Sequence, residues 1–193
     1  MKSHIERKSL LGLSLGVALL SACGPEAQEA AGPDTGQVSQ RLGNVLTNGS
    51  FEAAPAMGYS NYITLGSSTT GLTGWTVQNS VQLMASTYKT PAQGTRSINL
   101  SYGGVTQTFP TVNGGGYTVQ FSLSTSPACA TSTRLMDVSV NGTTYNFSTA
   151  SASWATRNFV FNASGTSTTI VFKNSYTGQV CGPAVDNISV SGP

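Results

Sequence analysis

The chain has 193 residues, of which only 8% are charged, and its formal net charge is +2. Its one histidine, His4, lies in the N-terminal segment, and region 42–193 sets Lys89, Arg96, Arg134, Arg157 and Lys173 against Glu52, Asp137 and Asp186, with no basic stripe. Region 42–193 therefore lacks a histidine that could act as a general base or activate a nucleophile, and its few scattered basic residues make nucleic acid a poor partner. We predict a protein that is no enzyme and binds no nucleic acid.

Residues 1–22 predict a signal peptide. A basic start precedes the apolar run Ser9–Leu20, which is too short to cross a bilayer core of ~30 Å as a helix. The run exits through Leu20-Ser21-Ala22-Cys23, which resembles the bacterial lipobox. The resemblance implies that Cys23 is lipidated and becomes the mature N-terminus. Ordinary cleavage near Ala22, which would leave a free cysteine, is the alternative. We expect a membrane-anchored lipoprotein of the cell envelope, at the outer membrane or the cell surface.

Residues 23–41 predict a flexible tether. They contain Pro, Gly, Gln and acidic residues, with Val38 as the one large aliphatic side chain after residue 23. Such a composition cannot offset the entropy of ordering the chain. Residues 42–193 then have the right size for a single domain.

Alternation of apolar and polar residues predicts strands along region 42–193. The dipeptide Asn141-Gly142 predicts a two-residue type I′ hairpin turn. Eight to ten short strands indicate an all-β fold, a β-sandwich or jelly roll. In chain order they are expected at 45–46, 75–84, 97–101, 105–109, 117–123, 136–140, around Tyr145 and Phe147, around Phe159 and Phe161, around Ile170 and Phe172, and at 184–190.

Two cysteines remain once Cys23 is assigned to the lipid. In an oxidising compartment Cys129 and Cys181 are expected to form a disulfide. Closing this ~52-residue loop would contribute about 4 kcal/mol to stability. Two free thiols are the alternative.

Asp186 shares strand parity with Ala184, Ile188 and Val190, so its carboxylate is expected on their apolar side. A buried carboxylate without a partner costs several kcal/mol, so a cation or strong donors must be near. Glu52 is a second carboxylate, and calcium suits two carboxylates supplemented by backbone carbonyls. The alternative is that Asp186 pairs with an arginine or accepts backbone N–H groups at a sheet edge.

A set of motifs resembles one family over nearly all of region 42–193. The opening NVLTNGSFE, residues 44–52, is similar to the start of the choice-of-anchor C family, which is related to plant cell-wall proteins called domain of unknown function 642. Further similar segments follow in order at 74–77, 96–100, 103–109, 117–123 and 181–190. The resemblance implies a galactose-binding-domain-like jelly roll, with structural calcium held by Glu52 and Asp186. The chain departs from the family at Asn99, where Asp is common.

This resemblance implies a module that binds cell-wall or extracellular polysaccharide. Sugars are held by aromatic platforms together with amides, hydroxyls and a few charges. The alternative is a structural or adhesive protein-interaction module of the cell envelope, in which the loop tyrosines only pack. An enzyme would need a pocket that joins Asp137 to another titratable group. The candidate ligand-binding residues are Tyr59, Tyr62, Tyr88, Tyr102, Asn99, Gln120, Arg134 and Asp137.

Overall fold

The computed structural model describes residues 43–129, 132–176 and 180–193. The expected signal peptide, the tether and Cys23 lie outside these residues. Across the described ranges, no helix is long and apolar enough to span a membrane. The secondary structure there consists of β-strands and one 3₁₀ turn, Pro127–Cys129.

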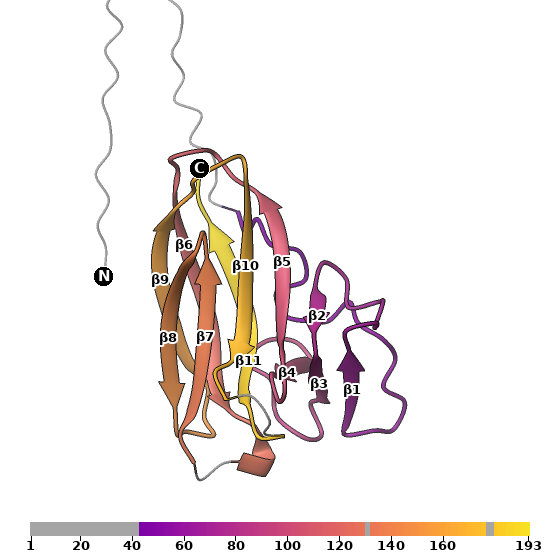
Figure 1. Cartoon of the computed structure of the whole chain (residues 1–193). Coiled ribbons are helices and arrows are strands. Elements are labelled where there is room, and N and C mark those ends of the chain that lie inside the picture. The colour runs from indigo at the N-terminus through magenta and orange to yellow at the C-terminus, as the bar shows by residue number, and fades with distance from the viewer. Residues whose placement is uncertain (1–42, 130–131, 177–179) are drawn as a thin grey trace, which may run out of the picture. The chain divides into compact units, whose positions relative to one another are not determined.

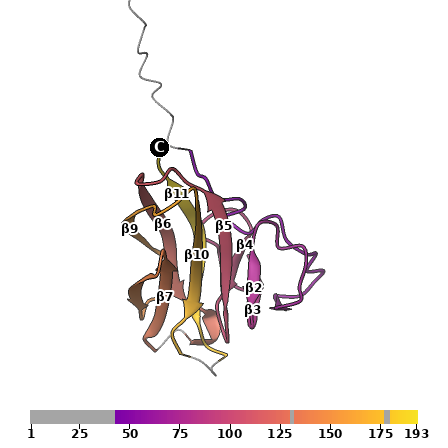
Figure 2. The same cartoon turned by 45° about the horizontal axis from the view of Figure 1, so that its top comes forward.

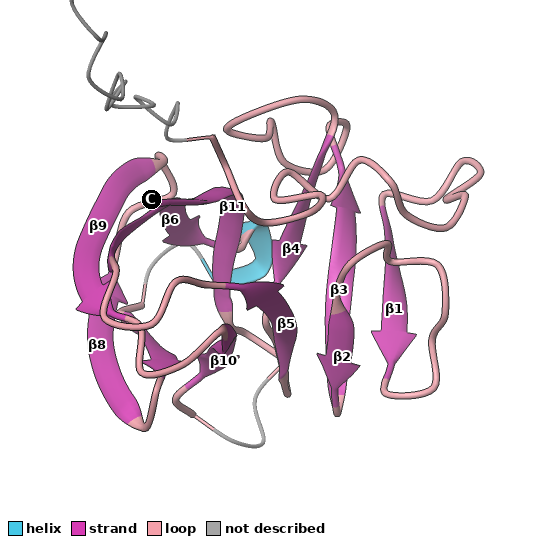
Figure 3. Cartoon of the chain, turned by 90° about the horizontal axis from the view of Figure 1, so that it is seen from above, coloured by secondary structure: helices cyan, strands magenta, loops and turns pink. Residues whose placement is uncertain are grey.

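The strands form two antiparallel sheets that are stacked as layers (Figure 3). Sheet A has the order β1-β3-β4-β11-β6-β9, and sheet B has the order β2-β5-β10-β7-β8. This confirms the predicted all-β jelly-roll sandwich. The strands are β1 Tyr62–Gly66, β2 Thr76–Gln78, β3 Ser80–Ala85, β4 Arg96–Asn99, β5 Gly104–Pro110, β6 Gly116–Thr125, β7 Arg134–Val140, β8 Thr143–Thr149, β9 Ala155–Asn162, β10 Ser167–Asn174 and β11 Pro183–Ser191 (Figure 1).

The core lies between the sheets and is formed by alternate residues of each strand. On β6, for example, Val119, Phe121 and Leu123 are fully buried. The Phe121 ring makes edge contacts with Phe172 of β10 and Phe147 of β8, at centroid distances of 5.3 and 5.0 Å. Such contacts between rings of opposite sheets fix how the layers stack. The predicted Asn141-Gly142 turn is present, with φ values of 49° and 77°, as a type I′ turn requires.

Two predicted strands differ from the structure. Residues 75–84 are divided at Asn79, whose φ is 59°, so the chain leaves sheet B after β2 and enters sheet A at β3. Residues 45–46 form no strand, although the Val45 N–H donates to the Val190 carbonyl over 2.8 Å. The Asn44 side chain takes the place of backbone pairing with β11. Its Oδ1 accepts from the Val190 N–H, and its Nδ2 donates to Ile188 O.

Strand β1 was not predicted. Its only fully apolar pair, Ile63 and Leu65, is too short to show a period. In the structure both side chains pack on the core, and β1 pairs with β3 from Tyr62↔Met84 to Gly66↔Ser80. Tyr62, expected in a loop, is therefore a strand residue at the edge of sheet A.

The predicted side of Asp186 is wrong, although its burial is correct. A β-bulge shifts the β11–β6 register between Asp186 and Ser189, and Asn187 has a φ of 50°. The extra residue reverses parity. Val185, Ile188 and Val190 therefore belong to the core, whereas Asp186, next to Val185, points to the outer side of sheet A.

Candidate binding surfaces and carboxylate cluster

The outer face of sheet B carries small hydroxyl side chains in rows that cross the strands. Their neighbours along each strand, such as Val138, Ile170 and Phe172, point into the core, so the hydroxyls point to solvent. Thr108 and Thr169 are cross-strand partners with their Oγ1 atoms 2.7 Å apart, and Ser139 and Thr144 are joined in the same way at 3.0 Å. Figure 2 shows β10 between β5 and β7 in this sheet. We call Thr106, Thr108, Ser139, Thr144, Thr169 and Val171 the hydroxyl face.

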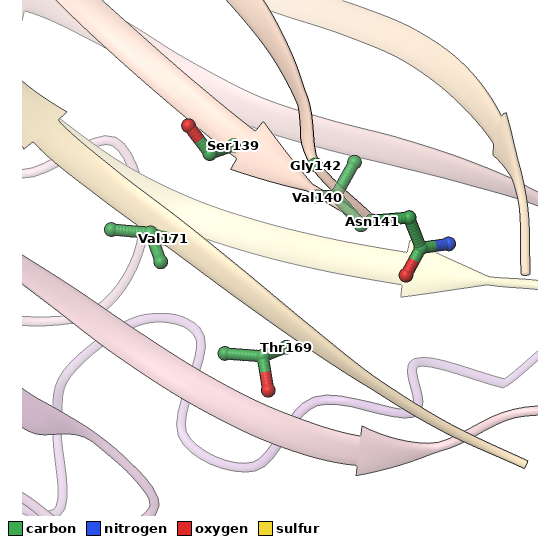
Figure 4. Close-up of a pocket in the computed structure, with 6 residues that line it drawn as sticks. All are labelled: Ser139, Val140, Asn141, Gly142, Thr169 and Val171. Carbon is green, nitrogen blue, oxygen red and sulfur yellow. The ribbon is translucent and has the colours of Figure 1, made fainter. Parts of the chain in front are cut away.

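A shallow hollow of about 400 Å³ lies on this face, between β7 and β10. It is lined by residues 139–142 of β7 and the following turn, and by Thr169 and Val171 of β10 (Figure 4). Ser139, Thr169 and Asn141 supply polar atoms, and Val171 supplies an apolar surface. The hollow thus combines an apolar contact with hydrogen-bonding groups from two strands.

The opposite end of the same face carries charge. Asp137 of β7 and Lys173 of β10 are cross-strand partners. The Asp137 Oδ1 accepts from Asn146 Nδ2 at 2.8 Å and from Ser175 Oγ at 2.6 Å. Tyr102, which is 38% exposed, lies in the turn before β5 at this end. The structure therefore brings two predicted ligand residues, Asp137 and Tyr102, to the same end of sheet B.

The outer face of sheet A is covered over part of its area. Asp186, Ser122 and Ser124 point away from the core but are 0–7% exposed. Part of the cover is the loop between β3 and β4, residues 86–95, which we call the strap. Within the strap, Lys89 Nζ lies 4.7 Å from the centroid of the Trp154 ring and donates to Ala152 O, and Trp154 Nε1 donates to Thr90 O. Burial lowers the pKa of Lys89. The strap is thereby fixed against the start of β9.

Glu52 and Asp186 both bind the strap and its junction with β4 through backbone N–H groups. Asp186 Oδ2 accepts from Ala92 N at 2.7 Å and Gln93 N at 2.9 Å, and its Oδ1 accepts from Asn187 N at 2.7 Å. Glu52 Oε1 accepts from the backbone N–H groups of residues 95 and 96, at 2.8 and 3.0 Å, and its Oε2 accepts from Thr95 Oγ1. Backbone N–H groups therefore donate to Asp186, as one of the alternatives expected, although β11 lies inside sheet A and not at its edge.

Burial raises the pKa of Asp186 to about 6. The N–H groups of Gln93, Asn187 and Ala92 oppose this rise, and the charge of Glu52 adds to it. Both carboxylates accept from residues 92–96, Asp186 from residues 92 and 93 and Glu52 from residues 95 and 96. Asp186 Oδ1 and Glu52 Oε2 each accept one hydrogen bond, which leaves lone pairs for a cation. The described part of the chain has no group of three or more His, Cys, Asp or Glu side chains arranged for a metal, so the remaining ligands would be carbonyls or water.

The predicted tyrosines fall at different places. Tyr62 and Tyr88 meet at the β1 edge of sheet A, with ring centroids 5.3 Å apart and planes inclined by 48°. Tyr59, three residues before Tyr62, is fully exposed. Gln120 is exposed on the outer face of sheet A, opposite Asn158 of β9.

Two predicted ligand residues are buried. Asn99 is 2% exposed, and its Oδ1 accepts from the N–H groups of Ser101 and Gly182. Arg134 is 8% exposed, and its Nη1 donates to Cys181 O. Neither side chain is placed to contact a ligand at the surface; both position the chain before β11. An uncharged amide at position 99 suits this role, because its Nδ2 also donates to Gln82 Oε1.

The predicted disulfide between Cys129 and Cys181 involves one side chain that the structure does not describe. The Cys129 side chain lies outside the described residues. Cys181 Sγ lies 3.7 Å from the carbonyl oxygen of Ala128, the residue before Cys129.

Several residues of the family-like segments stabilise the fold and do not form a binding surface. Gln107 is inward-facing and binds the Thr47 backbone twice, with Thr47 N to Oε1 at 2.7 Å and Nε2 to Thr47 O at 2.9 Å. Trp75 is in the core, and its Nε1 donates to Asn48 O. The residues of the hydroxyl face were not predicted as a site. In the sequence they appear only as the polar residues that alternate with apolar ones along each strand, and the solvent-facing side of any sheet shows that alternation.

Comparison with known proteins identifies the family and similar folds. Residues 44–191 match the family described as "Protein of unknown function (DUF642)". No curated protein matches the chain. An arabinose-bound α-L-arabinofuranosidase is 12% identical with a TM-score of 0.52, over 79% of this chain and 27% of the enzyme.

Two smaller solved domains are also similar. The CBM22-1 xylan-binding domain of Xyn10C from Paenibacillus barcinonensis is 12% identical with a TM-score of 0.46, over 67% of this chain and 92% of that domain. A family 35 carbohydrate-binding module from Clostridium thermocellum is 17% identical with a TM-score of 0.43, over 67% and 90%. At these identities the likeness concerns the fold.

Proposed function

This chain belongs to the DUF642 family. We propose that it is a non-catalytic module that binds cell-wall or extracellular polysaccharide and is anchored in the cell envelope by lipid on Cys23. Kinship with the choice-of-anchor C proteins is part of this proposal. The single observation that carries the binding function is the hollow on the hydroxyl face.

The chemistry of the hydroxyl face suits a neutral sugar chain. Its hydroxyls and the Asn141 amide can donate and accept hydrogen bonds, and Val171 offers an apolar contact to a ring face. Adjacent strands are about 4.8 Å apart, close to the length of one sugar unit in an extended chain. A polysaccharide that crosses the strands would therefore meet similar groups at each step.

Filling the hollow is expected to weaken polysaccharide binding. In Val171→Gln a longer side chain replaces the apolar contact, and we expect at least a tenfold loss of affinity, about 1.4 kcal/mol. The matched control is Val160→Gln, since Val160 is 68% exposed on β9 of the other sheet. Affinity would be measured by glycan array and by pull-down with insoluble polysaccharides.

An unchanged affinity of Val171→Gln would place the ligand elsewhere on the molecule. If the folded protein binds no polysaccharide, a structural or adhesive role with an envelope protein becomes the better reading.

We also propose a structural calcium ion held by Glu52 and Asp186. With chelator, lowering the pH from 7 to about 4 should raise stability through Asp186 by at most about 3 kcal/mol, because its folded pKa of about 6 exceeds the unfolded value of ~3.9. This gain is lost as the pH rises through 6. Calcium favours the ionised carboxylate, so it should raise the melting temperature at pH 7 and reverse the trend.

Thermal unfolding at several pH values, with calcium and with chelator, measures both effects. Asp186→Asn should remove the calcium response and the pH trend together. Identical melting curves with calcium and with chelator would refute the calcium site.

The cysteine proposals share one measurement. We propose lipid on Cys23 and a disulfide between Cys129 and Cys181, which the position of Cys181 beside Ala128 supports. The intact mass of membrane-purified protein, taken without reduction, should correspond to a chain that starts at a lipidated Cys23 and lacks two hydrogens. Cys23→Ala should be released from membranes. A chain without lipid, or with two alkylatable thiols, would contradict the respective proposal.

A further inference from the structure

The tyrosine pair at the β1 edge lies on the opposite outer face from the hydroxyl face. Ile63 and Leu65 of β1 pack on the core, so Tyr62 points to the outer side of sheet A. Ser139 and Thr169 point to the outer side of sheet B by the same reasoning. The layers in Figure 3 separate the two surfaces. One extended ligand segment therefore cannot lie on both.

Tyr59 and Tyr62 are exposed and do not belong to the hydrophobic core. Tyr62 is 43% exposed and Tyr59 fully exposed, yet Tyr62 contacts the half-buried Tyr88 ring of the strap. Two inclined rings held by different segments form a preorganised aromatic surface. We call the contacting pair Tyr62 and Tyr88 the tyrosine patch; Tyr59 lies three residues before Tyr62 in the chain.

The surroundings of the tyrosine patch are polar but uncharged. Thr87 Oγ1 donates to Asn61 Oδ1 beside it, and Thr64 is exposed on the same side of β1. The neighbouring charged groups have other partners.

These charged groups bind other parts of the domain. Lys89 contacts Trp154 and Ala152 O, Arg96 Nη1 donates to Ala54 O and Pro55 O, and Glu52 accepts from Thr95 and Arg96. Among the described residues, these nearby charged groups are therefore already engaged, whereas the C–H face of a neutral sugar ring suits exposed tyrosines.

We propose that the tyrosine patch is a second sugar-binding site, which stacks on neutral pyranose rings, and that the module therefore bridges two polysaccharide chains. The bridging rests on the proposed function of the hydroxyl face. The stacking site itself does not.

The test counts binding sites. Calorimetric titration of the purified full-length protein with cellohexaose, laminarihexaose and xylohexaose should give two sites per molecule for at least one oligosaccharide. Tyr62→Ala and Val171→Gln should each leave one site, and the double variant none. Tyr62→Phe, which keeps the ring, should retain two sites. Tyr176→Ala, a tyrosine of similar exposure after β10, is the matched control.

Bridging is measured by light scattering with the corresponding soluble polymers. The wild type should precipitate the polymer at intermediate ratios of protein to polymer, and each single variant should bind without precipitating it. One site in the wild type, unaffected by Tyr62→Ala, would overturn the tyrosine site and leave the hydroxyl face standing. One site that is lost in Tyr62→Ala and kept in Val171→Gln would overturn bridging and the hydroxyl face together. Precipitation by Tyr62→Ala equal to that of the wild type would also overturn bridging.

Discussion

The substitution Gly49→Ala is expected to prevent stable folding, with a loss of at least about 4 kcal/mol in the free energy of unfolding. A Cβ at position 49 would lie 1.9 Å from the backbone oxygen of Ile188. Relief would require backbone movement at the β11 bulge, where the Ile188 N–H donates to Gly49 O and Ile188 O accepts from Asn44 Nδ2. Circular dichroism during thermal unfolding measures the loss.

The matched control for this prediction is Gly66→Ala. Its Cβ would meet nothing closer than Asn79 O, at 3.9 Å. Its stability should stay within about 0.5 kcal/mol of the wild type. A Gly49→Ala protein that melts within a few degrees of the wild type would show that the β11 bulge can move.

Asp186→Ala is expected to lower the free energy of unfolding by about 3 kcal/mol at pH 7, even with chelator. Three backbone N–H donors, of Ala92, Gln93 and Asn187, would lose their acceptor, and each buried unsatisfied donor costs about 1–3 kcal/mol. Removal of the buried charge offsets part of this loss. The melting temperature should fall by roughly 10 °C.

Asp186→Asn should be intermediate, because one amide oxygen can replace only one carboxylate oxygen as acceptor. Asp137→Ala is the control, since Asp137 is half-buried at the surface of sheet B and accepts from side chains only. If Asp186→Ala is as stable as Asp137→Ala, the strap is not held by Asp186.

Most of the fold could be predicted from the sequence because apolar and polar residues alternate cleanly along several of its strands. On β6 the apolar and polar residues alternate over the eight positions Tyr117–Ser124, and β7 and β8 are separated by the Asn141-Gly142 turn. The prediction failed where side chains replace backbone pairing, as at Asn44, and where one left-handed residue changes sheet or parity, as at Asn79 and Asn187. The alternation of apolar and polar residues does not reveal where such a residue interrupts a strand.

The candidate sites were less predictable, because binding surfaces depend on which strands become neighbours. Asn99 and Arg134 are polar residues that the sequence could not distinguish from surface ligands, and both are buried. Thr108 and Thr169 are 61 residues apart, yet their hydroxyls meet across β5 and β10. The contact of Tyr62 with Tyr88 likewise depends on the path of the strap.

The pairing of the first described residues with the last strand has a kinetic consequence. Asn44 bonds to Ile188 and Val190, which are 144 and 146 residues away, and both ends of the domain meet at one end of the sandwich (Figure 1). Contacts between residues so far apart in the sequence form slowly, because the entropy of closing the long loop is lost before the contact can stabilise the fold. Sheet A cannot be completed until the last strand has been synthesised. Until then the domain lacks its native closure, which would suit the export that we propose for this chain.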